Sequence, residues 1–276
     1  MTTRDKPLAV RVSESAPGAG RLAAWWLGGS GFIFKTAGGK QIWIDPYLSD
    51  AVFTIFGVKR AFAAPIAASE AAPDVIISTH WHEDHLDPGS IPELARRRPG
   101  AKFVMPPSAM ARALSWGVPK GQIVPLSHGQ TERLAGAAIT AVPARHEPGI
   151  PGWEVPDAMG VIIEIDGVRI YHTGDTEYDV RLRRLRGQAF ALATFCINGV
   201  SGNMNAHEAA LLAWHLNVKT VIPHHHLIWA KDTVDPEETL NPKLFEETYR
   251  KLGGAAKVIL PEVGAGFQIT ADGAIS

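Results

Sequence analysis

The segment that decides the fold reads Ser78-Thr79-His80-Trp81-His82-Glu83-Asp84-His85 and directly follows an apolar run at residues 74–78. Three imidazoles and a carboxylate so close together at the end of an expected strand are costly to bury unless a charged partner satisfies them, and a divalent metal ion is such a partner. His80 and His82 point the same way in an extended chain. A turn after them would bring Asp84 and His85 to a second position. We therefore predict a metal site with space for two adjacent ions, with a solvated His-rich loop as the alternative.

The remaining ligands of a two-metal site are expected at the ends of other strands, because imidazole and carboxylate ligands converge from separate loops. Three residues follow apolar runs in this way: His146 after residues 138–142, Asp175 after residues 168–171, and His225 after residues 220–222. Taken singly, His146 suits a surface loop, Asp175 a turn, and His225 an exposed polar tract. Taken with residues 80–85, one metal centre explains all of them better.

Strand-like and helix-like runs are mixed throughout the chain, which is typical of an α/β fold. Asp166-Gly167 is a two-residue hairpin signal, and Gly38-Gly39 can serve in the same way. Early strands favour hairpins, whereas later ones alternate with helices, so we expect two packed sheets with helices outside them. Residues 1–22 mix charge with Ser, Pro and Gly, and we interpret them as a loosely held N-terminal extension to a single domain at residues 23–276. Strand-like runs lie at residues 23–27, 31–34, 41–44, 75–78, 102–105, 138–142, 161–165, 168–171, 192–197, 220–222, 257–260 and 266–270; helix-like runs lie at residues 90–97, 108–116, 206–216 and 241–252, the third with a capping-box-like start at Asn205 and Glu208.

The composition of the 276 residues is that of an ordinary globular protein, with 46% apolar residues, 20% charged residues and a net charge of −1. This charge gives no global case for a nucleic-acid or membrane partner. No apolar run is long enough to cross a bilayer, and the first 25 residues contain no segment of signal-peptide type. The single cysteine, Cys196, excludes an intramolecular disulfide and fits a reducing compartment. We predict a cytoplasmic protein with a small-molecule substrate and no membrane partner, and a homo-oligomer stays open.

The ligand candidates and one further carboxylate carry a resemblance to a known family. Asp45 in Ile42-Trp43-Ile44-Asp45-Pro46, the H-x-H-x-D-H segment, His146, Gly174-Asp175 and Pro223-x-His225 resemble, in order and separation, the metallo-β-lactamase superfamily over roughly residues 23 to 270. That resemblance implies an αββα sandwich, in which two packed mixed sheets carry helices on their outer faces. Within the superfamily the chain looks most like the L-ascorbate-6-phosphate lactonase branch, through Trp25-Trp26-Leu27-Gly28, Trp116-Gly117-Val118-Pro119-Lys120 and Val221-Ile222-Pro223-x-His225-His226-x-Ile228-Trp229.

The resemblance also implies a ligand set for two divalent ions per chain, either Zn or Mn. It assigns His80, His82 and His146 to one ion, Asp84, His85 and His225 to the second, and Asp175 to a bridge between them. Water held between two cations loses a proton near neutral pH and becomes the nucleophile, so Asp84 and Asp175 are catalytic candidates. Tyr178 is a third, as a donor to the developing oxyanion, although a loop-packing aromatic residue is an equal interpretation.

Other conspicuous residues receive supporting roles. Asp45 is expected to orient the loop at residues 80–85 from behind, because a ligating imidazole needs a partner for its other nitrogen. His224 and His226, which flank His225, are interpreted as structural residues. An arginine cluster is interpreted as a solvated helix face rather than an RNA-binding surface, since no aromatic residues are interleaved with it. The cluster comprises Arg181, Arg183, Arg184 and Arg186.

Three functions remain from the sequence: hydrolysis of a lactone or similar cyclic ester, which the branch resemblance implies; phosphodiester hydrolysis; and metal binding without catalysis, against which the complete ligand set argues. Candidate anchors for a phosphate or carboxylate are Lys59, Arg60 and Arg145, with no one of them preferred, so the substrate-binding residues stay unassigned. The loops at residues 46–73 and 147–160 carry aromatic residues that can form an apolar wall over a small substrate or bury a dimer interface.

Overall fold

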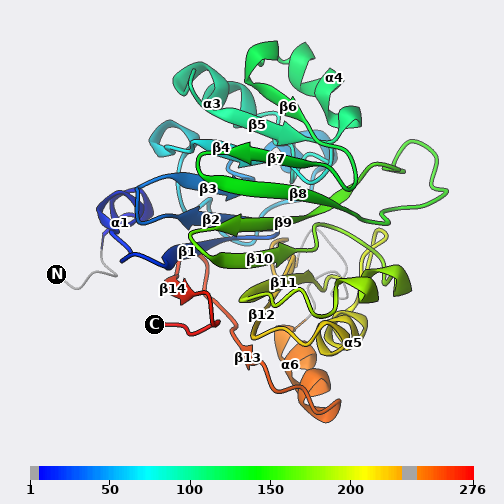
Figure 1. Ribbon diagram of the computed structural model, residues 1–276. Helices are drawn as coiled ribbons and strands as arrows, with labels where there is room; N and C mark the ends of the chain where they lie inside the picture. Colours follow the sequence, from blue (N-terminus) through cyan, green and yellow to red (C-terminus); the bar gives the residue numbers. More distant parts are fainter. Residues whose placement is uncertain (1–5, 232–240) are drawn as a thin grey trace.

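The computed structural model describes residues 6–231 and 241–276, which form two packed mixed sheets (Figure 1). In the first sheet, β1 to β3 are antiparallel neighbours and β3 to β6 run parallel, while β14 from the far end of the chain pairs with β1. Its strands, in spatial order, are β14 (Gly266–Thr270), β1 (Arg21–Gly28), β2 (Gly31–Lys35), β3 (Gln41–Ile44), β4 (Val75–Ile77), β5 (Lys102–Met105) and β6 (Ile123–Pro125).

The second sheet repeats this plan, with β7 to β10 antiparallel and β10 to β13 parallel. The predicted hairpin at Asp166-Gly167 joins β9 to β10, and both residues have the positive φ that a tight two-residue turn requires. The strands, in spatial order, are β13 (Lys257–Val258), β12 (Thr220–His224), β11 (Leu192–Cys196), β10 (Val168–His172), β9 (Met159–Ile165), β8 (Ala137–Pro143) and β7 (Thr131–Leu134).

Alternation along the strands places one hydrophobic core between the sheets and one on each outer face. Ile42 and Ile44 of β3, for example, belong to the cluster between the sheets, together with Ile163 of β9. Trp43, between them, belongs to the outer cluster of the first sheet. Phe195 of β11 belongs to the outer cluster of the second sheet. The predicted two-sheet architecture with helices outside is therefore confirmed.

The helices cover the two outer faces. The residues of α1 (Leu8–Glu14), α3 (Ile91–Arg97) and α4 (Pro107–Ser115) share the outer cluster of the first sheet. The residues of α5 (Ala206–Leu216), α6 (Pro242–Lys251) and the 3-10 helix η4 (Val180–Leu185) share that of the second, and Figure 1 shows the two groups on opposite sides. At the start of α5, Asn205 and Glu208 form the predicted capping box. Shorter helices are α2 (Ala51–Phe56), η2 (Ala68–Glu70) and η3 (Lys120–Gln122).

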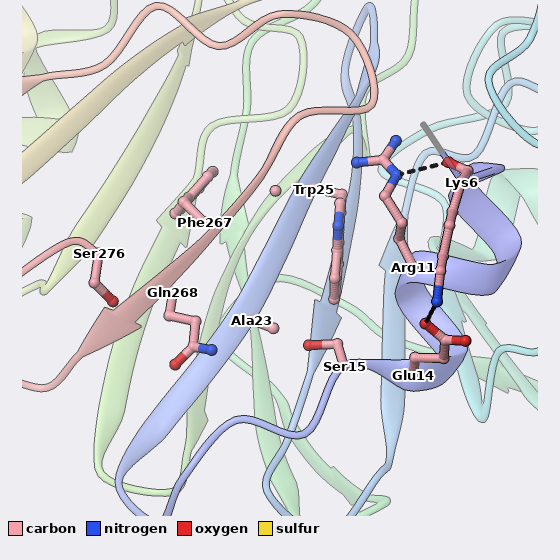
Figure 2. Close-up of a pocket in the computed structure, with 10 residues that line it drawn as sticks. Lys6, Arg11, Glu14, Ser15, Ala23, Trp25, Phe267, Gln268 and Ser276 are labelled. Carbon is pink, nitrogen blue, oxygen red and sulfur yellow. Dashed lines mark hydrogen bonds and ion pairs between the residues drawn. The ribbon is translucent and has the colours of Figure 1, made fainter. Parts of the chain in front are cut away.

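The expectation of a loosely held N-terminal segment is wrong for residues 8–14, which form α1. Leu8 and Val12 of this helix are buried against the first sheet. Lys35 of β2 donates hydrogen bonds of 2.8 Å to the carbonyl oxygens of Val12 and Ser13. Beside α1, β1 and β14 lies a surface cavity of about 410 Å³ (Figure 2). No helix within the described ranges has both the length and the apolar character to cross a membrane.

Candidate metal centre

Three imidazoles converge at the carboxyl end of the strands. His80 and His82 lie in the loop after β4, and His146 lies in the loop after β8. The Nδ1 atom of His82 is 2.9 Å from Nε2 of His80 and 3.0 Å from Nε2 of His146. All three side chains are buried. The first predicted metal position is therefore assembled from one loop of each sheet.

Hydrogen bonds to backbone carbonyl oxygens fix which ring nitrogen of His82 and of His146 faces the other imidazoles of the cluster. Nε2 of His82 donates to the carbonyl oxygen of Trp153 at 3.2 Å, and Nδ1 of His146 donates to that of Gly202 at 3.3 Å. A carbonyl oxygen only accepts, so His82 Nδ1 and His146 Nε2 are left with lone pairs that face each other. Burial lowers the pKa of both residues, that of His82 to about 4, so neither nitrogen is protonated at neutral pH. A cation satisfies this arrangement.

A second cluster consists of Asp84, His85 and His225. The Nε2 atom of His225 lies 3.3 Å from Oδ2 of Asp84, and that of His85 lies 3.6 Å from the same oxygen. Burial alone would lower the pKa of His225, but the carboxylates of Asp175 and Asp84 outweigh it and raise the pKa to about 10. The Nε2 atom of His85 is buried without a hydrogen-bond partner. A buried nitrogen in this condition fits a metal ligand.

Asp175 lies between the two clusters, in the loop after β10. Its Oδ2 atom is 3.2 Å from Nε2 of His225 and 3.5 Å from Nε2 of His85, and its carboxylate also approaches His80. Ser30 donates to Oδ1 at 3.2 Å, and the amide of Asn203 donates to Oδ2 at 2.7 Å. All seven sequence-predicted ligands therefore meet in one place, and the buried clusters fit a two-metal site with mixed nitrogen and oxygen ligands.

Asp45 occupies the position behind His85 that the sequence predicted. Its Oδ2 atom accepts a hydrogen bond of 2.8 Å from His85 Nδ1 and one of 2.7 Å from the Thr79 hydroxyl. Its Oδ1 atom accepts from the backbone N–H of Thr79 at 2.7 Å. With Nδ1 engaged in this way, His85 presents Nε2 to the metal position.

The two histidines beside His225 stay outside the clusters. His224 is fully buried, with its ring 4.5 Å from that of His172 and its Nδ1 atom 3.3 Å from Ser30 Oγ. His226 is buried against Trp26, with ring centroids 5.0 Å apart. These contacts agree with the structural interpretation of both residues.

Tyr178, the third catalytic candidate, follows Asp175 by three residues. Tyr178 packs against the outer hydrophobic cluster of the second sheet, and it is not among the described residues that line the cavity over the metal clusters. The loop-packing interpretation agrees with this placement.

The three candidate anchors are not among the described residues that line the cavity over the metal clusters. The guanidinium of Arg60 donates to the Tyr47 carbonyl at 2.7 Å and lies over the Tyr47 ring, so it is part of the scaffold. Arg145 pairs with Glu177 at 3.3 Å. The Lys59 ammonium lies 5.8 Å from the centre of the Phe53 ring, outside the set of residues that line the cavity.

The cavity over the metal clusters has a volume of about 190 Å³ and two different walls. The expected apolar wall is present: Phe56 comes from residues 46–73 and Trp153 from residues 147–160, with ring centroids 5.5 Å apart. The polar wall comes from a loop that sequence reasoning missed. It includes Asn198, Ser201 and Asn203, and the signal in the sequence was the Asn-Gly and Gly-Asn pairs that follow the apolar run at residues 192–197.

Comparison with known proteins gives consistent results. The model of the β-lactamase superfamily domain matches residues 41–226, a range that includes Asp45 and every predicted ligand. A UPF0173 metal-dependent hydrolase of Thermococcus onnurineus is 32% identical over 84% of this chain and 93% of its own length. The probable L-ascorbate-6-phosphate lactonase UlaG of Salmonella heidelberg is 24% identical over 94% of this chain and 83% of its own.

Solved structures share the architecture. Igni18, described as a novel metallo hydrolase from the archaeon Ignicoccus hospitalis, superposes with a TM-score of 0.68 at 25% identity, covering 90% of this chain and 98% of that one. The metallo-β-lactamase fold protein YhfI of Bacillus subtilis superposes with a TM-score of 0.65 at 15% identity, covering 90% and 99% of the two chains, and it shares the fold alone.

Proposed function

Since the chain belongs to the metallo-β-lactamase superfamily and is a metal-dependent hydrolase, we propose that it opens a lactone or a similar cyclic ester. The observation that carries the choice of reaction is the lining of the cavity: among the residues that the structure describes, neither Lys nor Arg lines it. Phosphodiester hydrolysis builds up charge on phosphoryl oxygens and usually recruits cationic side chains beside the metals. A planar ester carbonyl has no such requirement.

The residues of the site have separable roles in this proposal. When two divalent ions are bound, they lower the pKa of water and act as Lewis acids on the attacked carbonyl. Ser30 and Asn203 hold the carboxylate of Asp175 between the two clusters, and this carboxylate sets the spacing of the clusters. Asp84 lines the cavity beside His85 and His225, where its carboxylate can take a proton from the attacking water and pass it to the alkoxide oxygen that leaves the carbonyl. The apolar wall excludes bulk water.

The identity of the metal is part of the proposal. The histidine-rich donor set favours Zn, whereas the resemblance of the sequence motifs to the lactonase branch favours Mn. Reconstitution of the metal-free protein with each ion, followed by the same hydrolysis assay, distinguishes them.

The reaction is tested with metal-loaded protein in weakly buffered solution, where a pH indicator follows acid release. We expect a panel of sugar lactones and other small lactones to be hydrolysed, and bis-aryl phosphodiesters to react much more slowly. The Asp175→Ala variant supplies the background. If a diester is hydrolysed efficiently while every lactone matches that background, the protein is a phosphodiesterase of the same superfamily.

We also propose a small molecule, rather than a nucleic acid or a membrane, as the partner, and the cytoplasm as the location. The arrangement of the arginine cluster argues against a nucleic-acid partner. Arg181, Arg183 and Arg184 lie on η4, over the outer face of the second sheet, and Arg181 pairs with Asp179 at 2.6 Å. Arg181 is therefore paired locally, and none of the four arginines is among the described residues that line the cavity over the metal clusters.

A further inference from the structure

We propose that the preferred substrate is an uncharged lactone with an apolar substituent, not a phosphorylated or carboxylated one. This inference rests on the proposed lactone hydrolysis and specifies the substrate of the same site. The reacting carbonyl must lie at the metal clusters, so the rest of the substrate meets the walls of the cavity. Those walls decide which substituents are tolerated.

The first wall is apolar and partly uncovered. It is formed by Val52, Phe56, Val58, Trp153 and Trp229. Phe56 is 44% exposed and Trp153 is 40% exposed, although their rings lie 5.5 Å apart at the cavity. An apolar substituent laid against these two rings would remove that surface from water, and this gain favours an alkyl or acyl group at this wall.

The described lining of the cavity offers an anionic substituent no cationic side chain. This lining includes the carboxylates of Glu83, Asp84, Glu147 and Asp175. Glu83 is already paired with Arg112 at 2.8 Å, and Arg112 is not part of the described lining. Beyond the reach of the bound ions, whose charge is shared with Asp84 and Asp175, a phosphate would be desolvated beside Glu147 with no cationic side chain in the described lining.

The second wall accepts hydrogen bonds without supplying positive charge. It carries Glu147, Asn198, Ser201 and Asn203. The amide nitrogen of Asn203 is used by Asp175, so its carbonyl oxygen, Oδ1, remains without a partner. Neutral hydroxyl or N–H groups of a substrate can donate to this oxygen, whereas a phosphate dianion, which only accepts hydrogen bonds, cannot.

The proposal is tested with three γ-butyrolactones that differ only in the substituent on the ring: n-butyl, hydroxymethyl or phosphoryloxymethyl. With the metal-loaded protein we expect kcat/KM for the butyl compound to exceed that for the phosphorylated one by at least about tenfold. An equal or higher value for the phosphorylated lactone overturns the inference and leaves lactone hydrolysis standing.

Binding of the matched lactams, measured by calorimetry, separates the two proposals. Lactams with the same three substituents are not turned over, so their affinities report the walls alone. Tighter binding of the butyl lactam supports the inference. If the butyl lactam binds more tightly while no lactone is hydrolysed, the proposed lactone hydrolysis fails, and the preference of the cavity for an apolar substituent stands. Tighter binding of the phosphorylated lactam overturns the inference.

A pair of matched variants tests whether Phe56 forms the subsite for the apolar substituent. Phe53 and Phe56 lie on the same helix, α2, and both are 44% exposed, but only Phe56 lines the cavity. We expect Phe56→Ser to raise KM for the butyl lactone about fivefold or more without changing that for the hydroxymethyl lactone, and Phe53→Ser to change neither. Equal effects of the two variants contradict an apolar subsite at Phe56.

A variant that adds a positive charge tests whether the lack of a cationic side chain in the cavity disfavours phosphorylated substrates. Val58→Lys places a cation in the cavity wall, and Val180→Lys places one at an exposed position on η4. We expect Val58→Lys to shift the ratio of kcat/KM, phosphorylated over butyl, upward by about tenfold, and Val180→Lys to leave it unchanged. No shift, in a variant that keeps the melting temperature of the parent, means that lack of a cation does not limit phosphorylated substrates.

Discussion

The Asp45 Oδ2 atom lies 2.8 Å from His85 Nδ1, across the boundary between two parallel strands. Asp45 directly follows β3 and has a φ of 43°, in the left-handed region, which turns its carboxylate toward the loop after β4. Because Nδ1 is engaged, Nε2 of His85 faces the metal clusters. The orientation of one predicted ligand is therefore set by a residue that touches no predicted metal position.

We predict that Asp45→Asn weakens metal binding by about 10- to 100-fold, because the charged acceptor for His85 Nδ1 is lost. Asparagine tolerates positive φ, so the backbone conformation should survive. Titration of the metal-free protein against a chelator of known affinity measures the change. Asp74→Asn removes a carboxylate at the opposite end of β4 and should leave affinity unchanged. Equal losses in both variants would contradict an orienting role for Asp45.

Metal content should fall from about two to about one divalent ion per chain in His146→Ala, because the first cluster loses one of its three imidazoles. Elemental analysis after gentle purification gives the stoichiometry. His207→Ala, an exposed histidine that bonds Thr248, is the control and should keep two ions. A wild-type value near one that His146→Ala does not alter would show that His146 is a loop residue and that the site holds a single ion.

Asp175→Ala should reduce hydrolysis by more than about 100-fold while far-UV circular dichroism stays close to that of the metal-free parent. The reason is that its carboxylate lies within 3.5 Å of Nε2 of both His85 and His225. Asp179→Ala, which removes a carboxylate four residues later that pairs with Arg181, serves as the control. Turnover at the parental rate in Asp175→Ala would disprove the assignment.

Metal binding at the second cluster should release protons at neutral pH. In the metal-free protein the carboxylates hold the pKa of His225 at about 10 and that of His85 well above its ordinary value, so both imidazoles are protonated at pH 7. Ligation needs neutral imidazoles, so apparent affinity should rise with pH, by about tenfold per unit for each proton displaced. Calorimetry in buffers of different ionisation enthalpy counts these protons.

Proton release at the first cluster provides a comparison within the same protein. Burial lowers the pKa of His80 and His82, that of His82 to about 4, so these imidazoles are already neutral above pH 6. One of the two binding events should therefore release about two protons and the other close to none. Release of no protons in either event would contradict the charge state described for His85 and His225.

Cys196 should be inert in the folded protein. Burial and the nearby Asp175 raise the pKa of its thiol to about 12, so almost no thiolate exists at pH 7. We expect no reaction with a disulfide reagent until the chain is unfolded in guanidinium, and unchanged hydrolysis in Cys196→Ser. Rapid labelling of the native protein that also abolished activity would place the thiol in the mechanism instead.

Much of the metal centre could be predicted because its signal is local in the sequence. A buried strand followed by several imidazoles and carboxylates has few satisfactory environments, and the structure brings all seven candidate ligands together. The substrate anchors had no such signal. The sequence does not distinguish a guanidinium that binds backbone carbonyls, as in Arg60, from one that binds an anion.

The elements that the sequence did not predict share a weak pattern. β7 (Thr131–Leu134) is an edge strand with mostly exposed side chains, and β6 (Ile123–Pro125) has three residues and ends in proline. In α2 only Val52 is buried, so the helix has no apolar stripe. In α1, by contrast, Leu8 and Val12 have helical spacing, and the surrounding Pro, Ser and Gly residues hid it.

The seven predicted ligands divide four to three between the two sheets: four follow β4, and one each follows β8, β10 and β12. During synthesis, a chain that has emerged from the ribosome only as far as β6 offers four ligands and no complete cluster. His225 must also emerge before the second cluster exists. Complete metal binding therefore has to wait until most of the chain has been synthesised. An ion at either cluster then links ligands from an early part of the chain to ligands from a later part.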